Sequence, residues 1–69
     1  MYNDITSIND LIGKEVQIYP RDTFEKWGRI IDINESGVLF QITRSRCDSF
    51  RVGSIRFIAY SANLTFVYN

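Results

Sequence analysis

The sequence has no histidine and only one cysteine, Cys47. General acid–base catalysis near neutral pH most often uses histidine, and a nucleophilic thiol needs a neighbouring base. Disulfides and transition-metal sites need more cysteine or histidine ligands than this chain contains. We therefore expect a protein that is not an enzyme and uses no metal or cofactor, with Cys47 an ordinary loop residue.

The sequence also lacks long apolar runs and a secretory signal. No stretch approaches the ~20 apolar residues that span a bilayer. Residues 1–12 contain two aspartates and no basic residue ahead of an apolar segment. A lone thiol is typical of a reducing compartment. We expect a cytoplasmic protein that does not contact membranes.

The chain has 69 residues, of which 45% are hydrophobic and ten are aromatic. This length corresponds to one domain, residues 1–69. Because such a small domain buries a modest share of its surface and has no disulfide or metal, oligomerisation is the usual remaining source of stability. The composition therefore favours a homo-oligomer.

The charges are unevenly distributed, although their formal sum is zero. Residues 1–35 contain seven acidic and four basic side chains, whereas residues 36–69 contain four arginines and one aspartate. The neutral total argues against a general nucleic-acid coat protein. The arginines still leave room for a local anion site, and the opposite charges of the two halves would steer head-to-tail assembly.

The strongest structural signal is a hairpin from Trp27 to Thr43. Two β-branched and aromatic runs, Trp27–Ile33 and Val38–Thr43, are joined by Asn34-Glu35-Ser36-Gly37. This joint suits a type I turn with Gly37 in the left-handed conformation. Alternation along the two strands predicts the following faces: Val38, Phe40 and Ile42 together, Ile31 and Ile33 together, and Ile30 and Leu39 on the other sides.

Shorter signals complete an all-β chain with five strands. The remaining predicted elements are a helical turn within residues 3–12, strands over Lys14–Tyr19, Phe50–Tyr60 and Leu64–Tyr68, a bend at Gly53, and a tight turn at Ser61–Asn63. Residues 20–26 and 44–49 are expected to be polar loops.

This order resembles small SH3-like or Sm-like barrels, in which a short helix precedes five bent strands. Gly28, Asp32 and Asn34 are similar to conserved positions of the first Sm motif, at a shorter spacing. Ile55-Arg56 is similar to the start of the second Sm motif, with Phe57 in place of its glycine. The resemblance implies a five-stranded barrel, with RNA contacts by Asp32, Asn34 and Arg56.

Two further resemblances concern a short segment and the general character of the chain. The segment LIGKEV, followed by a strand with an early glycine, resembles the opening of PRC-barrel domains. A short chain without histidine is also typical in style of phage accessory proteins. The first agrees with a small barrel and does not select one family, whereas the second concerns the style of the chain alone.

The arginines of the second half are the candidate binding residues: Arg44, Arg46, Arg51 and Arg56. Continuing the Val38 face along its strand leads to Arg44 and Arg46, which we expect to lie side by side. Arginine makes bidentate contacts with phosphate or carboxylate, which lysine does not. The alternative is that these are solvated residues that pair with acids of residues 1–35 in the same or a neighbouring subunit.

Four aromatic residues with a polar group need not be fully buried: Tyr19, Trp27, Tyr60 and Tyr68. They could line a groove for an extended peptide or, beside arginines, stack on bases. The alternative is packing in the core or in an interface. The uncharged last strand would form an exposed edge, so we expect it to pair with a neighbouring subunit or partner.

These features favour a non-catalytic binding or adaptor protein that self-associates and docks onto another macromolecule, such as a phage-type accessory or inhibitor protein. The alternative function is Sm-like binding of nucleic acid or a nucleotide through the arginines of residues 44–56.

Overall fold

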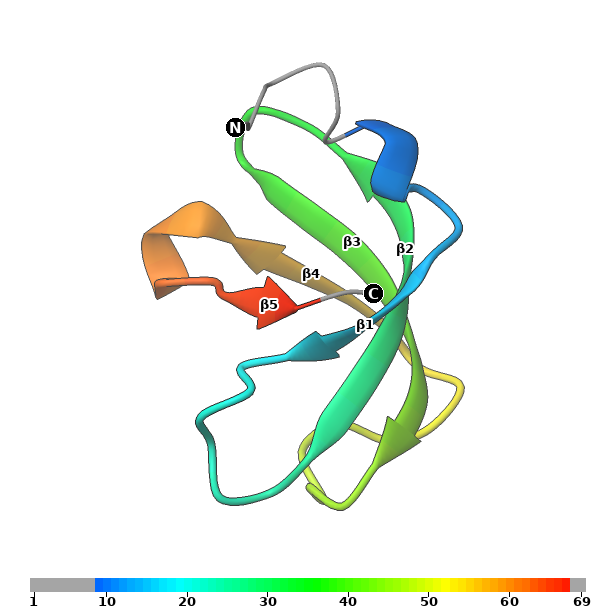
Figure 1. The fold of residues 1–69 in the computed structure, drawn as a ribbon, viewed down its shortest axis with the longest axis vertical. Coiled ribbons are helices and arrows are strands. Elements are labelled where there is room, and N and C mark those ends of the chain that lie inside the picture. The colour runs from blue at the N-terminus through cyan, green and yellow to red at the C-terminus, as the bar shows by residue number, and fades with distance from the viewer. Residues whose placement is uncertain (1–8, 68–69) are drawn as a thin grey trace.

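The computed structural model describes residues 9–67, which form five antiparallel strands in one sheet. The strands are β1 (Glu15–Ile18), β2 (Lys26–Ile33), β3 (Gly37–Ser45), β4 (Ile55–Ala59) and β5 (Phe66–Val67) (Figure 1). Two 3-10 turns, η1 (Asn9–Leu11) and η2 (Tyr60–Ala62), precede β1 and follow β4. The predicted all-β fold, the helical turn before Gly13 and the tight turn before the last strand are confirmed.

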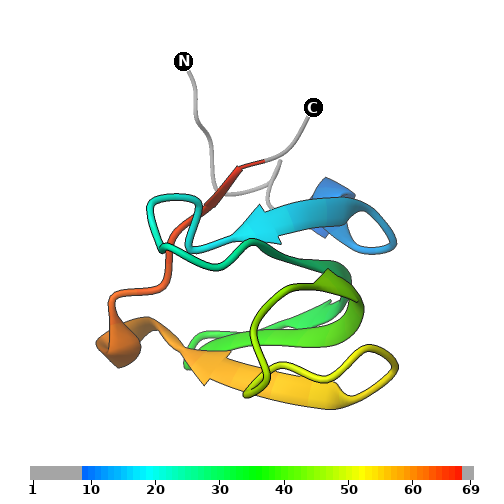
Figure 2. The ribbon, with the colours of Figure 1, turned by 90° about the horizontal axis from the view of Figure 1, so that it is seen from below.

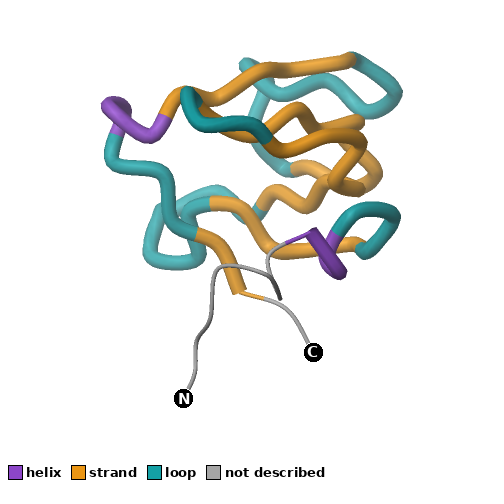
Figure 3. The backbone as a smooth tube through the Cα atoms, turned by 90° about the horizontal axis from the view of Figure 1, so that it is seen from above, coloured by secondary structure: helices purple, strands orange, loops and turns teal. Residues whose placement is uncertain are grey.

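The sheet is curled, and its strand order is β4-β3-β2-β1-β5. β1 and β5 lie across from β3 and β4, with the long strand β2 between the two pairs (Figures 2 and 3). β4 and β5 are the ends of this order, and the described residues form no ladder between them. The structure therefore shows a curled five-stranded sheet, and closure into the predicted barrel is not shown.

The space inside the curled sheet is filled with apolar side chains. The buried core consists of Leu11, Val16, Ile18, Ile30, Val38, Phe40, Ile42 and Ile58. The predicted face of Val38, Phe40 and Ile42 is confirmed, since none of the three is more than 1% exposed. The rings of Phe40 and Phe66 meet edge to face with centroids 6.2 Å apart, so β5 packs onto β3 across the core.

The expected pairing of Ile31 with Ile33 on one face is wrong. Ile33 packs against the core together with Ile30, whereas Ile31 is 40% exposed. The register between β2 and β3 shifts between Ile30 and Asp32, which leaves Ile31 without a partner. Such a bulge interrupts the alternation of faces, and a period-two pattern read from the sequence does not reveal it.

The hairpin turn also differs from the prediction. The glycines in the left-handed region are Gly13 and Gly53, and Gly37 is not one of them. The Asn34 side-chain oxygen accepts hydrogen bonds from the amides of Ser36 and Gly37, at 2.7 and 3.1 Å, and this closes the turn. Glycine is required at position 37 for space, because a Cβ there would lie 2.3 Å from the Ile58 carbonyl oxygen of β4.

β4 is shorter than the strand predicted over Phe50–Tyr60. Residues before Ile55 form a turn in which the Gly53 amide donates to the Ile42 carbonyl at 2.7 Å. The predicted bend at Gly53 is confirmed, since its φ is +90°. The last strand is described at Phe66–Val67 only, and Tyr68 lies outside the described residues.

We predict that Gly37→Ala destabilises the protein by about 3 kcal/mol, at the upper end of the range for overpacking, because β4 would have to move away from β3. Urea unfolding measures the change. The neighbouring exposed substitution Ser36→Ala is the control and should stay within about 0.5 kcal/mol of wild type. Equal stabilities of the two variants would contradict the prediction.

Candidate functional site

The inner face of β3 ends at a bulge. The ladder pairs Gly28 with Ile42 and Trp27 with Arg44, so Thr43 has no partner on β2. The alternation of faces is interrupted there. Arg44 consequently lies with Trp27 on the outer face of the sheet, instead of continuing the core face of β3 as predicted.

On the outer face, Arg44 is bound within its own chain. Its guanidinium carbon lies 4.3 Å from the centroid of the Trp27 ring, and its Nη2 lies 3.3 Å from a carboxylate oxygen of Glu15. The indole N–H of Trp27 donates to Glu25 at 2.6 Å. Arg44 therefore follows the alternative given above, in which the arginines pair with acidic residues of residues 1–35.

Glu15 is stabilised as an anion by this arrangement. The Thr43 hydroxyl donates to it at 2.5 Å, and this hydrogen bond is the main cause that lowers the pKa of Glu15 below its ordinary value. Burial raises the pKa, and Arg44 lowers it further through a hydrogen bond and its charge. The charge of Arg29 has a smaller effect in the same direction.

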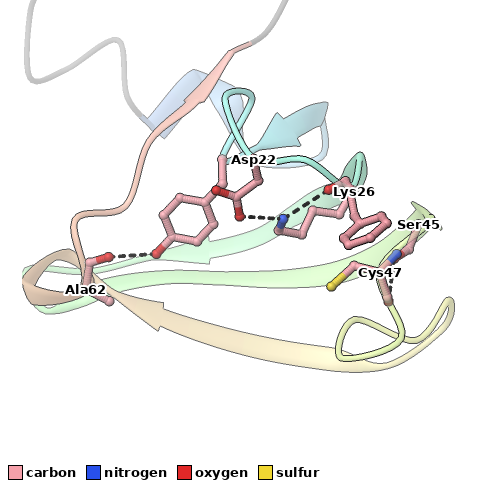
Figure 4. Close-up of polar contacts among 7 residues, drawn as sticks. Asp22, Lys26, Ser45, Cys47 and Ala62 are labelled. Atoms are coloured by element: carbon pink, nitrogen blue, oxygen red, sulfur yellow. Dashed lines mark hydrogen bonds and ion pairs between the residues drawn. The ribbon is translucent and has the colours of Figure 1, made fainter.

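On the inner face, the same end of the sheet contains a buried lysine. Lys26 is 2% exposed, and its Nζ lies 2.9 Å from Asp22 and 3.2 Å from the Phe24 carbonyl oxygen (Figure 4). The rings of Phe50 and Tyr19 lie 5.3 and 5.7 Å from the Nζ, measured to their centroids. We call these five residues the lysine cage. A buried ammonium is costly unless it is paired, and here a carboxylate, a carbonyl and two rings offset that cost.

The lysine cage is not predicted from the sequence, in which residues 20–26 have the composition of a polar loop. Lys26 is the first residue of β2, and it shares the inner face with Gly28 and Ile30, both also buried. Extending the period-two pattern backwards from Ile30 would have placed Lys26 inside. The aspartate four residues earlier is the second signal that could have identified it.

Arg56 is also held within the chain, away from Arg44. Its guanidinium carbon lies 4.4 Å from the centroid of the Phe50 ring, and its Nη1 donates to the Ser49 carbonyl. The Phe50 ring therefore contacts two cations, Lys26 and Arg56. These contacts fix the loop between β3 and β4 against the sheet.

The other two arginines line an open hollow of about 640 Å³, which we call the 45–52 hollow. Its lining consists of Ser45, Arg46, Cys47, Asp48, Phe50, Arg51 and Val52. Within residues 9–67, neither Arg46 nor Arg51 has an ion-pair partner. Arg44 and Arg46, predicted to lie side by side, also line a second, smaller hollow with Glu25, Trp27 and Ser45. Of the four predicted arginines, Arg46 and Arg51 thus share the 45–52 hollow, whereas Arg44 and Arg56 contact other residues of their own chain.

The predicted aromatic residues do not share one groove. Tyr19 packs against the core and donates from its hydroxyl to the Ala62 carbonyl at 2.8 Å, whereas Trp27 lies on the outer face under Arg44. Tyr60 is exposed on η2, and Tyr68 lies outside the described residues.

The two remaining positions from the Sm resemblance have local structural roles. The Asp32 carboxylate accepts a hydrogen bond from the Ile33 amide at 2.9 Å, beside the bulge in β2. Asn34 closes the hairpin turn through its side-chain oxygen. Both side chains are therefore engaged by the backbone next to them.

No family model, curated protein or solved structure matches this chain. Across residues 9–67, no helix has the length and apolar character needed to cross a membrane. The same residues contain no group of three or more histidine, cysteine or acidic side chains placed to hold a metal ion.

We predict that Asp22→Asn lowers the free energy of unfolding by about 1–3 kcal/mol, because the buried Lys26 ammonium loses its carboxylate partner. Urea unfolding at pH 7 measures the loss. Asp48→Asn removes an exposed carboxylate of the same charge and should change stability by no more than about 0.5 kcal/mol. Equal effects of the two substitutions would show that the Lys26 pair contributes nothing specific.

We predict that Glu15 stabilises the fold above about pH 4.3, where the glutamate of the unfolded chain is ionised. Its pKa is lower in the folded state, so this stabilisation is lost as the pH falls through the folded pKa. Glu15→Gln should therefore unfold at a lower urea concentration than wild type at pH 7, with a smaller further loss on acidification. Glu35→Gln, in the exposed hairpin turn, is the control and should retain the acid dependence of wild type.

Proposed function

We propose that this chain is a non-catalytic docking protein that assembles with a second copy of itself through β4. The observation that carries the proposal is the position and chemistry of this strand. β4 is one end of the sheet, and its outward side chains are apolar and exposed.

The outer surface of β4 carries two exposed apolar side chains. Ile55 and Phe57 are 52% and 49% exposed. We call them the β4 face. Phe57 lies opposite the half-buried Leu39 in the ladder, so the apolar surface continues onto β3. Exposed apolar side chains that gather on one strand are typical of interaction sites, whereas scattered ones are ordinary.

The charges that usually protect an edge strand do not protect β4. Its only charged residue is Arg56, whose side chain is held by Phe50 and the Ser49 carbonyl of the same chain. A charged side chain on an edge strand opposes pairing with another chain when that pairing would bury the charge without a partner. Because Arg56 already has partners, pairing along β4 would isolate no charge.

A second copy is the partner that fits this edge. It brings the same strand without outward charges, and the small domain has no disulfide to stabilise it alone. Pairing of β4 with β4 would give a symmetric dimer. Pairing of β4 with the other end strand, β5, would give a ring or a filament. Docking onto a different macromolecule would use the remaining surface of such an assembly.

We also propose that the fold is a small SH3-like barrel that is open between β4 and β5, and that the protein acts in the cytoplasm. The strand order and the 3-10 turn between the last two strands support the first statement. The lone cysteine supports the second.

We predict that wild-type protein at high micromolar concentration has a mass in solution of at least twice 8.1 kDa. Ile55→Lys and Phe57→Lys place a charge on the β4 face and should each shift the mass to that of one chain. Light scattering coupled to size-exclusion chromatography measures the mass. Ile12→Lys is the matched control, because Ile12 is 44% exposed and lies outside the β4 face.

Thermal unfolding followed by circular dichroism shows whether the lysine variants remain folded. Folded single chains of both variants, beside assembled wild type and Ile12→Lys, would support the proposal. A wild-type protein that remains a single chain at high micromolar concentration would overturn it, as would lysine variants that assemble like wild type.

A further inference from the structure

We propose that the 45–52 hollow binds the phosphate group of a small phosphorylated molecule, with Arg46 and Arg51 as its ligands. This inference concerns a surface other than β4 and does not depend on self-association. Its volume of about 640 Å³ lies within the range of small-molecule sites, roughly 300–1,000 Å³.

Two arginines with free guanidinium groups provide the charge for this site. Arg46 and Arg51 both line the hollow, and neither is paired with an acid among residues 9–67. The planar guanidinium donates two parallel hydrogen bonds to a phosphate, so two such groups match the several oxygens of one phosphate. A single carboxylate carries one charge and would satisfy only one of the two arginines.

The number of available arginines favours a small ligand over a nucleic-acid strand. Binding along a strand needs a row of cations that neutralises successive phosphates. Arg44 is stacked on Trp27 beside Glu15, and Arg56 is held by Phe50. Of the four candidate arginines, Arg46 and Arg51 have no ion-pair partner among residues 9–67, and both line the 45–52 hollow, which accounts for one phosphate and not for a row of them.

The loop that forms the hollow is fixed before any ligand arrives. The Arg46 amide donates to the Glu25 carbonyl at 2.7 Å. The Ser45 hydroxyl donates to the Cys47 carbonyl and accepts from the Cys47 amide, both at 2.9 Å. The Phe50 ring lies against Lys26 and Arg56. Because these contacts already order the loop, ligand binding loses less conformational entropy.

Asp48 indicates what else the ligand carries. Asp48 lines the same hollow. A carboxylate at this position would repel a second phosphate and accept a hydrogen bond from a hydroxyl group. The expected ligand is therefore a phosphate monoester of a hydroxylated molecule, such as a sugar or polyol phosphate.

The test is an NMR titration of the full chain with glycerol 3-phosphate. The readout is the chemical shift of the ¹⁵N–¹H signals of the backbone amides and of the arginine Nε groups. We expect saturable shifts confined to residues 45–52 and to the Arg46 and Arg51 side chains. Arg46→Gln and Arg51→Gln should each weaken binding about tenfold, because each removes one charge-assisted contact. Arg21→Gln, an exposed arginine outside the hollow, should bind like wild type.

Methyl phosphate, which has no hydroxyl group, tests the role of Asp48. Wild type should prefer glycerol 3-phosphate, and Asp48→Asn should reduce that preference while it retains phosphate binding. A well-dispersed spectrum of each variant shows that it is folded.

Three results would overturn the proposal. One is the absence of saturable shifts, and another is an equal response of Arg21 and the hollow arginines. The third is tighter binding of a single-stranded oligonucleotide without terminal phosphates, with a steep salt dependence. Phe57→Lys should bind glycerol 3-phosphate like wild type, which separates this test from the test of self-association.

Discussion

The arrangement of polar residues in this protein depends on the bulge at Thr43. Up to Ile42, alternate side chains of β3 enter the core, and after the bulge Arg44 lies on the outer face with Trp27. The bulged Thr43 itself donates to Glu15 on β1. The bulge therefore places Arg44 where it can pair with Glu15. Arg46, which follows the end of β3, lines the 45–52 hollow.

The Phe50 ring links the interior to the loop between β3 and β4. It contacts Lys26 of the lysine cage and Arg56 of β4, so two cations that would otherwise be unfavourable near the core are stabilised by one ring. The same contacts hold the loop that carries Arg46 and Arg51. The internal cations thus order the loop, and the free arginines are the ones available for an external ligand.

The two proposed binding surfaces use different physical interactions. The β4 face is apolar and lies at an end of the sheet, where burial of apolar area and strand pairing would drive association. The 45–52 hollow is polar, and charge-assisted hydrogen bonds would drive binding there. Val52 lines the hollow and β4 begins at Ile55, so the two proposed surfaces are adjacent along the chain.

The amino-acid sequence is sufficient to predict the all-β class, the hairpin, the core face of Val38, Phe40 and Ile42, and the turns near Gly13, Gly53 and Asn63. These features follow from local alternation and turn chemistry. The role of Gly37 could not be predicted, because it depends on the approach of β4, which is distant in the sequence.

The partners of the charged side chains depend on how distant segments pack in three dimensions. Four arginines near one another in the sequence suggested one cluster, but Arg44 pairs with Glu15 and Arg56 packs on Phe50, whereas Arg46 and Arg51 have no ion-pair partner among residues 9–67. The burial of Lys26 likewise depends on Phe50, which comes from another loop. A pattern in the sequence shows which residues alternate, whereas the partner of a charge is fixed only when distant segments pack together.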